Sequence, residues 1–198
     1  MTDNIFEQMA KRYDTPDRIE LTNIILEQIK PEFQNTQTST LLGYGSGTGL
    51  IGLELSSLVD SVVLVDSSEQ MLEVAEAKIN SQKIKNAEVL NADFTKEVLA
   101  VQADIILISL VFLHVPDTNL LLENLYSILN PGGKLIIIDF DKNEKVSHPK
   151  IHNGFTHEEM ENYLLQVGFK SIETETFHSG KNIFAKQDAS MFMSTSLK

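Results

Sequence analysis

The sequence has no cysteine among its 198 residues, which excludes disulfide bonds and thiolate metal sites. It also lacks any apolar run close to the roughly 20 residues that a membrane helix needs. The first residues, MTDNIFEQMAKRYD, are polar and acidic and contain no signal-peptide core. We therefore expect a cytoplasmic protein without a membrane partner.

Positive charge is also scarce. The chain has 16 Lys and Arg residues against 28 Asp and Glu residues, which gives a net charge of −12. A surface this acidic repels phosphate backbones, and no stripe of basic residues with interleaved aromatics offsets it. These features disfavour a nucleic-acid partner and favour a small-molecule substrate; the oligomeric state is left open.

What the chain does contain is an alternation of apolar runs and helical patterns. The apolar runs are too uniformly hydrophobic for a sheet with one wet face, so they indicate parallel strands covered on both sides; they are residues 39–44, 61–66, 87–91, 103–110 and 133–140. Helical spacing falls between them at 49–58, 69–80 and 120–129, the last capped by Asp117 or Thr118. This order predicts a doubly wound α/β fold with right-handed crossovers.

The two ends of the chain depart from this alternation. Residues 3–31 have helical spacing, and Thr15-Pro16 predicts a break with an N-cap, so we expect two helices there. After a polar loop over 141–155, a capping box at Thr156–Glu159 predicts a helix that stops at Gly168. Segments 171–177 and 190–196 then alternate as an antiparallel pair joined by a turn over 179–188. We expect an N-terminal helical cap, 1–38, on a main domain, 39–198, as one structural unit.

The stretch Thr40–Gly52, TLLGYGSGTGLIG, is the pattern of a buried strand that ends in a glycine-rich turn opening a helix. The turn needs glycine, and the helix would offer free amides to an anionic or polar ligand. Gly47-x-Gly49-x-x-Gly52, with Asp66 19 positions after Gly47, matches the dinucleotide fingerprint and leaves an NAD(P)-dependent oxidoreductase open. No tyrosine has a lysine four residues on, as a common hydride-transfer site would require.

The alternative template, Gly45-x-Gly47-x-Gly49, resembles the loop of class I S-adenosylmethionine (SAM) methyltransferases of the small-molecule type. Five further segments resemble that family in the right order: VVLVDSSEQML (62–72), NADF (91–94), ADIILISLVFLHVPD (103–117), LNPGGKLIIID (129–139) and FTHEEMENYLLQVGF (155–169). The resemblance implies a Rossmann-like, mainly parallel seven-stranded sheet with an antiparallel C-terminal pair. It implies SAM as the cofactor and methyl transfer to a small molecule; a SAM-binding module without catalysis remains open.

The resemblance also implies a cofactor site. Asp66 would accept hydrogen bonds from the ribose diol, although it could instead cap the helix starting near Ser68. Asp93 and the amide of Phe94 would bind adenine, unless Asp93 is only a solvated loop residue. The full set of expected cofactor-binding residues is Gly43, Tyr44, Gly45, Gly47, Asp66, Ser67, Met71, Asp93, Phe94, Ser109 and Leu110. Of these, Met71 fits the face of adenine and plain core equally well.

One position departs from the family. Two residues before the first loop glycine, most members carry an acid that supports the ammonium group of the SAM methionine moiety. Here that residue is Gly43. The resemblance therefore leaves open how the ammonium group is held.

Methyl transfer requires no obligatory catalytic side chain, because the cofactor carries the reactivity and the protein aligns the reactants. If the acceptor must lose a proton, a histidine is the usual base. His114 follows the fourth strand, and His148 and His152 lie in the loop after the fifth; each could equally be an ordinary loop residue. AKRYD (10–14) resembles a family pattern that would bring Tyr13 to the acceptor or the cofactor, or leave it packed on the sheet. No metal site is expected.

Overall fold

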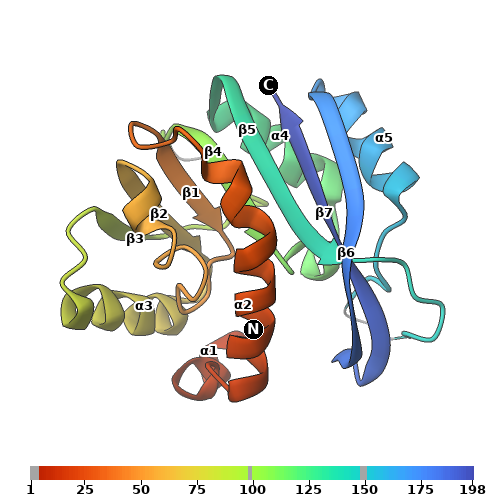
Figure 1. Ribbon diagram of the computed structural model, residues 1–198, viewed down its shortest axis with the longest axis horizontal. Helices are drawn as coiled ribbons and strands as arrows, with labels where there is room; N and C mark the ends of the chain where they lie inside the picture. The colour runs from red at the N-terminus through yellow and green to blue at the C-terminus, as the bar shows by residue number, and fades with distance from the viewer. Residues whose placement is uncertain (1–4, 98–99, 148–150) are drawn as a thin grey trace. The chain divides into compact units, whose positions relative to one another are not determined.

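The structure, a computed structural model, describes residues 5–97, 100–147 and 151–198 (Figure 1). It divides into two compact units, Met1–Asp93 and Phe94–Lys198. The expected fold class is confirmed, because the described residues form a seven-stranded α/β sheet that is mostly parallel and ends in an antiparallel pair.

The first unit holds three parallel strands in the order β3-β2-β1. Their registers pair Leu42 with Val63 and Val63 with Glu88. Its elements are α1 (Ile5–Met9), η1 (Ala10–Arg12), α2 (Pro16–Ile29), η2 (Lys30–Phe33), β1 (Thr40–Tyr44), η3 (Ser56–Leu58), β2 (Ser61–Asp66), α3 (Glu69–Gln82) and β3 (Ala87–Asn91).

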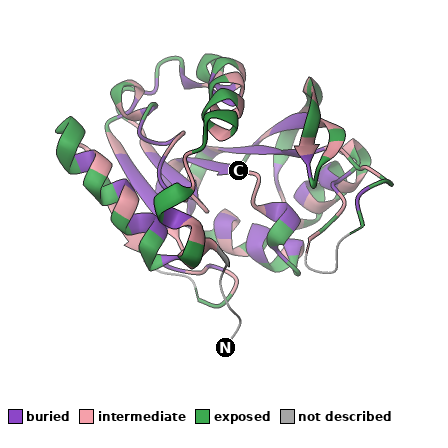
Figure 2. Ribbon diagram, turned by 90° about the horizontal axis from the view of Figure 1, so that it is seen from below, coloured by how far each residue is buried: buried purple, intermediate pink, exposed green. Residues whose placement is uncertain are grey.

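Local sequence explains where these helices begin. The hydroxyl of Thr15 accepts the N–H of Arg18, and Pro16 occupies the first turn of α2, so the expected helix break is confirmed. The hydroxyl of Ser68 caps α3 by accepting the N–H of Met71 at 3.2 Å. One face of α3 is buried against the unit and the other is exposed, as its helical spacing predicts (Figure 2).

The helix expected over 49–58 is wrong. The chain forms a series of turns there and then the short 3₁₀ helix η3. Hydrogen bonds switch from Leu53 N–H to Gly49 O, four residues back, to Ser56 N–H to Leu53 O, three residues back. Gly52 also lies so close to β2 that a Cβ there would be 2.5 Å from Leu64 Cδ2. The glycines therefore bring this segment close to the sheet instead of starting a regular helix.

The second unit holds four strands in the order β4-β5-β7-β6. Strands β4 and β5 are parallel, whereas β7 runs antiparallel to both β5 and β6. Helix α5 packs against α4 and β6 (Figure 1). The elements are β4 (Ala103–Ser109), η4 (Phe112–His114), α4 (Thr118–Ile128), β5 (Leu129–Phe140), α5 (His157–Val167), β6 (Lys170–Phe184) and β7 (Gln187–Leu197).

The expected caps of this unit are confirmed. Asp117 caps α4 by accepting the N–H of Leu120 at 3.0 Å. Thr156 and Glu159 form the capping box of α5, and Gly168 ends that helix in the left-handed conformation at φ 111°. These contacts satisfy backbone groups that a helix end cannot pair by itself.

Two boundaries differ from expectation. Strand β5 begins at Leu129 rather than 133, because residues 130–133 form a bulge whose Gly132 and Gly133 bond to Lys198. The turn expected over 179–188 is wrong, since β6 and β7 continue to a two-residue turn at Ala185-Lys186. Both turn residues have positive φ, 48° and 63°, which is typical of a type I′ hairpin but unusual for alanine and lysine.

Candidate functional site

The glycine-rich turn and the end of β2 are joined through one carboxylate. Asp66 Oδ2 accepts the N–H of Gly47 at 2.8 Å, and Asp66 Oδ1 accepts the N–H of Ser68 at 2.8 Å. Asp66 is the last residue of β2, and Gly47 follows β1, its parallel neighbour. The carboxylate therefore fixes the turn beside the carboxyl end of β2, where ligands of such sheets bind.

The turn itself is built on left-handed backbone. Gly45, Gly47 and Gly49 have φ of 64°, 54° and 78°, a conformation that side chains disfavour. The expectation that the amides at the start of the predicted helix are free is wrong for Gly49, which donates to Ser46 O at 2.9 Å. Within the turn, Gly47 donates to Asp66 and Ser46 donates to Val65 O at 2.9 Å, so hydrogen bonds to β2 hold the loop in shape.

Burial raises the pKa of the Asp66 carboxyl, and the hydrogen bonds from Ser68 and Gly47 oppose that rise. The nearby carboxylate of Glu7 raises the pKa further. A carboxylate offers about four lone-pair positions, and the backbone amides of Gly47, Ser68 and Ser67 occupy three of them. Asp66 can therefore accept one more hydroxyl group while it holds the loop.

Tyr13 lies against the glycine-rich turn. A Cβ built on Gly47 would be 3.8 Å from Tyr13 Cε1, and the Arg18 guanidinium stacks 3.9 Å from the centre of the Tyr13 ring. Arg18 Nη1 also donates to Tyr13 O at 3.0 Å. Burial raises the pKa of the Tyr13 hydroxyl. The structure thus places Tyr13 beside the loop, and its role toward the acceptor or the cofactor stays a prediction.

Asp14, the residue after Tyr13, takes part in a group of polar contacts that the sequence does not reveal. Asp14 accepts a hydrogen bond from the Thr48 hydroxyl and lies 2.7 Å from Lys78 Nζ, which also donates to Thr48 O at 2.8 Å. We call Asp14, Thr48 and Lys78 the N-terminal latch. These residues are 30 to 64 positions apart in the chain, so no local pattern could have indicated it.

Glu7 makes a second connection from the N-terminal segment. Its carboxylate accepts the N–H groups of Glu69 at 3.1 Å and Gln70 at 3.4 Å, in the first turn of α3. A carboxylate at this position satisfies amides that the helix leaves unpaired and interacts favourably with the helix dipole. The segment from α1 to Asp14 is therefore attached both to α3 and to the glycine-rich turn.

The other expected cofactor residues of the first unit have varied surroundings. Met71 is 1% exposed, whereas Ser67 is exposed and Asp93 is half-buried. Gly43 and Tyr44 are buried in β1, and Gly43 is not among the residues with positive φ. The segment leading to Asp93 is bound to β2, because Ala92 N–H and Asn91 Nδ2 both donate to Asp66 O.

In the second unit, two of the expected residues, Ser109 and Leu110, lie at the end of β4. Leu110, directly after that strand, has φ of 57° and donates its N–H to Ile138 O at 2.8 Å. A positive φ costs a leucine conformational energy and is often found at functional sites. Ser109 and Leu110 are partly exposed, whereas Phe94 is fully buried and its carbonyl accepts Asn124 Nδ2.

The histidine candidates do not share one environment. His114 is exposed on η4. His152 lies against the same segment, because its N–H donates to Leu113 O at 2.8 Å and its ring Nε2 is 3.1 Å from Val115 O. His148 falls outside the described residues. The structure thus connects the loop after β5 to the segment after β4.

Asp139 is a second site residue that we did not predict. It lies on β5 with 0% exposure, and its carboxylate accepts the N–H groups of Phe140 at 2.8 Å and Leu113 at 3.4 Å. The Phe112 N–H is a further donor to it. Burial raises the pKa of Asp139 to about 7, despite these hydrogen bonds. An acid inside the apolar run LIIIDF was the available signal.

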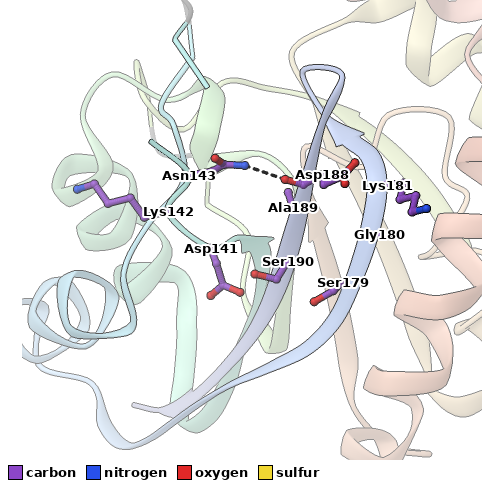
Figure 3. Close-up of a pocket in the computed structure, with 9 residues that line it drawn as sticks. All are labelled: Asp141, Lys142, Asn143, Ser179, Gly180, Lys181, Asp188, Ala189 and Ser190. Carbon is purple, nitrogen blue, oxygen red and sulfur yellow. Dashed lines mark hydrogen bonds between the residues drawn. The ribbon is translucent and has the colours of Figure 1, made fainter. Parts of the chain in front are cut away.

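A cavity of about 470 Å³ opens between the segment after β5 and the β6–β7 hairpin (Figure 3). Asp141 carries two contacts beside it, with His157 Nε2 at 3.1 Å and the Thr176 hydroxyl at 3.0 Å. Asn143 Nδ2 bridges to Asp188 O. The lining is polar apart from Gly180 and Ala189; its other members are Asp141, Lys142, Asn143, Ser179, Lys181, Asp188 and Ser190.

Two kinds of feature are absent from residues 5–97, 100–147 and 151–198. None of the helices described combines the length and hydropathy that a membrane crossing needs. The same residues contain no group of three potential His, Asp or Glu ligands placed to hold a metal ion.

Comparison with known proteins assigns this arrangement to a family. A family model described as "Methyltransferase domain" matches residues 35–186, so the chain belongs to that methyltransferase family. The expected membership of the class I SAM-dependent methyltransferase family is confirmed.

Individual relatives agree with that assignment. The ubiquinone/menaquinone biosynthesis C-methyltransferases UbiE of Wigglesworthia glossinidia brevipalpis and Escherichia coli are 29% identical over 154 residues. The match covers 72% of this chain and 60% of theirs, so the chain spans less than two thirds of the length of these relatives.

Solved structures share the fold. A SAM-dependent methyltransferase from Aquifex aeolicus is 25% identical with a TM-score of 0.75, covering 96% of this chain and 97% of that one. Phosphoethanolamine N-methyltransferase 2 of Haemonchus contortus, solved with S-adenosyl-L-methionine, has a TM-score of 0.75 over 98% of this chain and 60% of its own. Its 18% identity is evidence for the fold alone.

Proposed function

We propose that this protein transfers the methyl group of SAM to a small, polar molecule, and that the carboxyl ends of β1 and β2 bind the cofactor. The observation that carries this proposal is the Asp66 carboxylate bonded to the glycine-rich turn at Gly47. Such a carboxylate beside a glycine-rich turn suits a ribose, whose hydroxyl groups donate charge-assisted hydrogen bonds.

The residues present fit SAM. The left-handed turn at Gly45, Gly47 and Gly49 lets a ligand approach the backbone closely, and the lone pair left on Asp66 can accept a ribose hydroxyl. Asp93 and the amide of Phe94 would bind adenine, whereas Met71, at 1% exposure, packs in the core. When bound, SAM supplies a methyl group activated by its sulfonium centre, and the chain's own residues hold and align the reactants.

The remaining expected residues complete the proposed site. Tyr44 and Ser67 lie next to the turn and the carboxylate in sequence, and Gly43 leaves the ammonium group to backbone carbonyls and water. Ser109 and Leu110, at the end of β4 in the second unit, would also contact the ligand, because ligands of parallel sheets bind outside the carboxyl ends of strands. Tyr13, attached to the turn through the N-terminal segment, would close the methionine end of the site.

A polar acceptor is supported by the cavity of Figure 3. Its segment 141–143 directly follows β5, so it lies at the edge where the parallel strands β4 and β5 both end. The lining offers hydroxyl, amide and charged groups, which recognise hydrogen-bonding molecules. Either His114 or His152 could serve as a base. We also propose a cytoplasmic location, for which the absence of cysteine is the support.

Ligand-dependent thermal stability tests the cofactor proposal. SAM or S-adenosylhomocysteine at 100 times its dissociation constant should stabilise the protein by about 2.7 kcal/mol, whereas NAD(H) should have no effect. Stabilisation by NAD(H) alone would overturn the proposal. Release of S-adenosylhomocysteine during incubation with a panel of hydroxyl- and amine-bearing acceptors then tests catalysis. Binding without turnover across the panel would favour a non-catalytic SAM-binding module.

A further inference from the structure

The segment that follows β4 is held by hydrogen bonds to one buried side chain, that of Asp139. Asp139 accepts the N–H groups of Leu113 and Phe112, two consecutive residues of η4, and that of Phe140 on its own strand. A fully buried carboxylate is costly unless hydrogen bonds satisfy it, and here backbone amides supply those bonds. The position of η4 and the charge of Asp139 therefore depend on each other.

The loop after β5 holds the same segment through a second set of contacts, made by His152. His152 donates its N–H to Leu113 O, and its ring contacts Val115 O. Between these two attachments and the end of β4 lies Leu110, in its left-handed conformation. We call residues 110–114 the β4 segment, because they directly follow strand β4. The contacts above give this segment a defined conformation, which at Leu110 is one that the residue type does not favour.

We propose that Asp139 is a positioning residue for methyl transfer: its carboxylate holds the β4 segment in the conformation that places Leu110 and His114 at the carboxyl edge of the sheet. This inference rests on the proposed site, since it assigns that segment to the acceptor side. Asp139 itself is buried beneath the segment and contacts neither reactant.

Protonation of Asp139 weakens this hold, because a neutral carboxyl group is a poorer acceptor than a carboxylate. The ionisable side chains on the elements packed around it, β4, η4, β5 and β7, are Asp104, His114, Lys134 and Asp188, and Asp141 and His152 follow nearby in the chain. None of them contributes to the raised pKa, which arises from burial and is opposed by backbone amides alone. The hold should therefore follow the ionisation of Asp139 itself.

Hydrogen exchange of individual amides, measured by NMR on the full chain, tests the proposal. We expect the protection factors of Leu113 and Phe112 to fall at least tenfold as the pH decreases from 8.5 to 5.5. In Asp139→Asn, whose carboxamide does not titrate, they should be low at both pH values. Asp104→Asn, a matched change on β4 whose carboxylate pairs with Asn130, should behave as the wild type.

Protection of the central β5 amides, Ile136 and Ile137, separates positioning from general destabilisation. The proposal requires their protection in Asp139→Asn to stay within threefold of the wild type, with turnover reduced and the KM for SAM unchanged. Equal protection of Leu113 in wild type and variant would overturn it, and so would a loss spread over β5. Failure of every form to bind S-adenosylhomocysteine would instead contradict the proposed function.

Discussion

Asp66 and Gly47 are bound to each other at 2.8 Å, so the residue proposed to hold the ribose also shapes the loop that receives the cofactor. Replacing Asp66 therefore removes a ligand contact and a structural one together. Affinity and stability should respond to the same substitution, by different amounts.

Asp66→Ala should weaken the binding of S-adenosylhomocysteine by about 1.5–3 kcal/mol, the scale of hydrogen bonds to a charged group. It should also lower the free energy of unfolding by about 1–2 kcal/mol, since the Gly47 and Ser68 amides lose their acceptor. Isothermal titration calorimetry and urea unfolding measure the two effects. The control is Asp60→Ala, an exposed acid just before β2. An unchanged affinity would mean that the ribose is held elsewhere.

Gly43→Asp should restore the acid that most family members carry at this position. Gly43 has no positive φ, and a Cβ there would lie 3.6 Å from Ser46 Cβ and 3.7 Å from Leu64 Cδ2, which are ordinary contacts. SAM should bind about 1–3 kcal/mol more tightly, while the ligand-free protein melts earlier because the new carboxylate is buried. Calorimetry on Gly43→Ala, expected to change affinity by less than about 0.5 kcal/mol, isolates the effect of the charge. Weaker SAM binding by the Asp variant would count against the proposed position of the ammonium group.

Lys78→Met should open the N-terminal latch. The ion pair with Asp14 is partly exposed, so we expect global stability to change by less than about 1 kcal/mol. Locally, the amides of residues 5–14 should exchange faster, and the dissociation constant of S-adenosylhomocysteine should rise about fivefold, equivalent to about 1 kcal/mol. Lys85→Met, at an exposed lysine after α3, serves as the control. Unchanged exchange in residues 5–14 would show that the latch does not hold the segment.

Asp139 should make the protein less stable as the pH rises from about 4 to about 7. Burial raises its pKa in the folded state to about 7 from the ordinary value of 3.8, so between these values only the folded state keeps the proton. Its stabilising contribution is complete below pH 4 and is lost as the pH rises through the folded pKa, by at most about 4 kcal/mol. Urea unfolding of wild type and Asp139→Asn across this range measures the difference. Parallel curves for the two proteins would contradict the prediction.

The alternation of apolar runs predicted the α/β class, because the central strands β1, β2 and β4 are buried and hydrophobic along their length. The expectation that residues 87–91 are covered on both sides is wrong, since β3 lies at the edge of the sheet and none of its residues is buried. The side chains of three residues cap helices by accepting the N–H three residues on; they are Ser68, Asp117 and Thr156. Because such caps are local, those at Asp117 and Thr156 could be predicted from the sequence. The prediction of a helix over 49–58 is wrong because the conformation of this segment depends on the approach of Gly52 to Leu64, a contact with a different element, β2. The two-residue turn at Ala185-Lys186 could not be predicted, because neither alanine nor lysine indicates a left-handed backbone.

The candidate site divides in the same way. Asp66 and the glycine-rich turn carry a spacing that the chain displays directly. The latch of Asp14, Thr48 and Lys78 depends on folding to bring distant residues together. Asp139 resembles one more position of a buried strand in the sequence, and the packing of η4 against it, which brings the Leu113 amide to its carboxylate, depends on the fold.

The irregular ladder between β6 and β7 also bears on how this protein avoids aggregation. Strand β6 pairs on one side only, with β7, so its other side is the edge of the sheet. Its register shifts three times, and Ser171 and Asn182 adopt positive φ within two of these interruptions. Exposed Lys170, Glu173 and Glu175 also lie along it. A second polypeptide approaching this edge would meet an interrupted series of backbone groups flanked by charged side chains, which discourages strand addition.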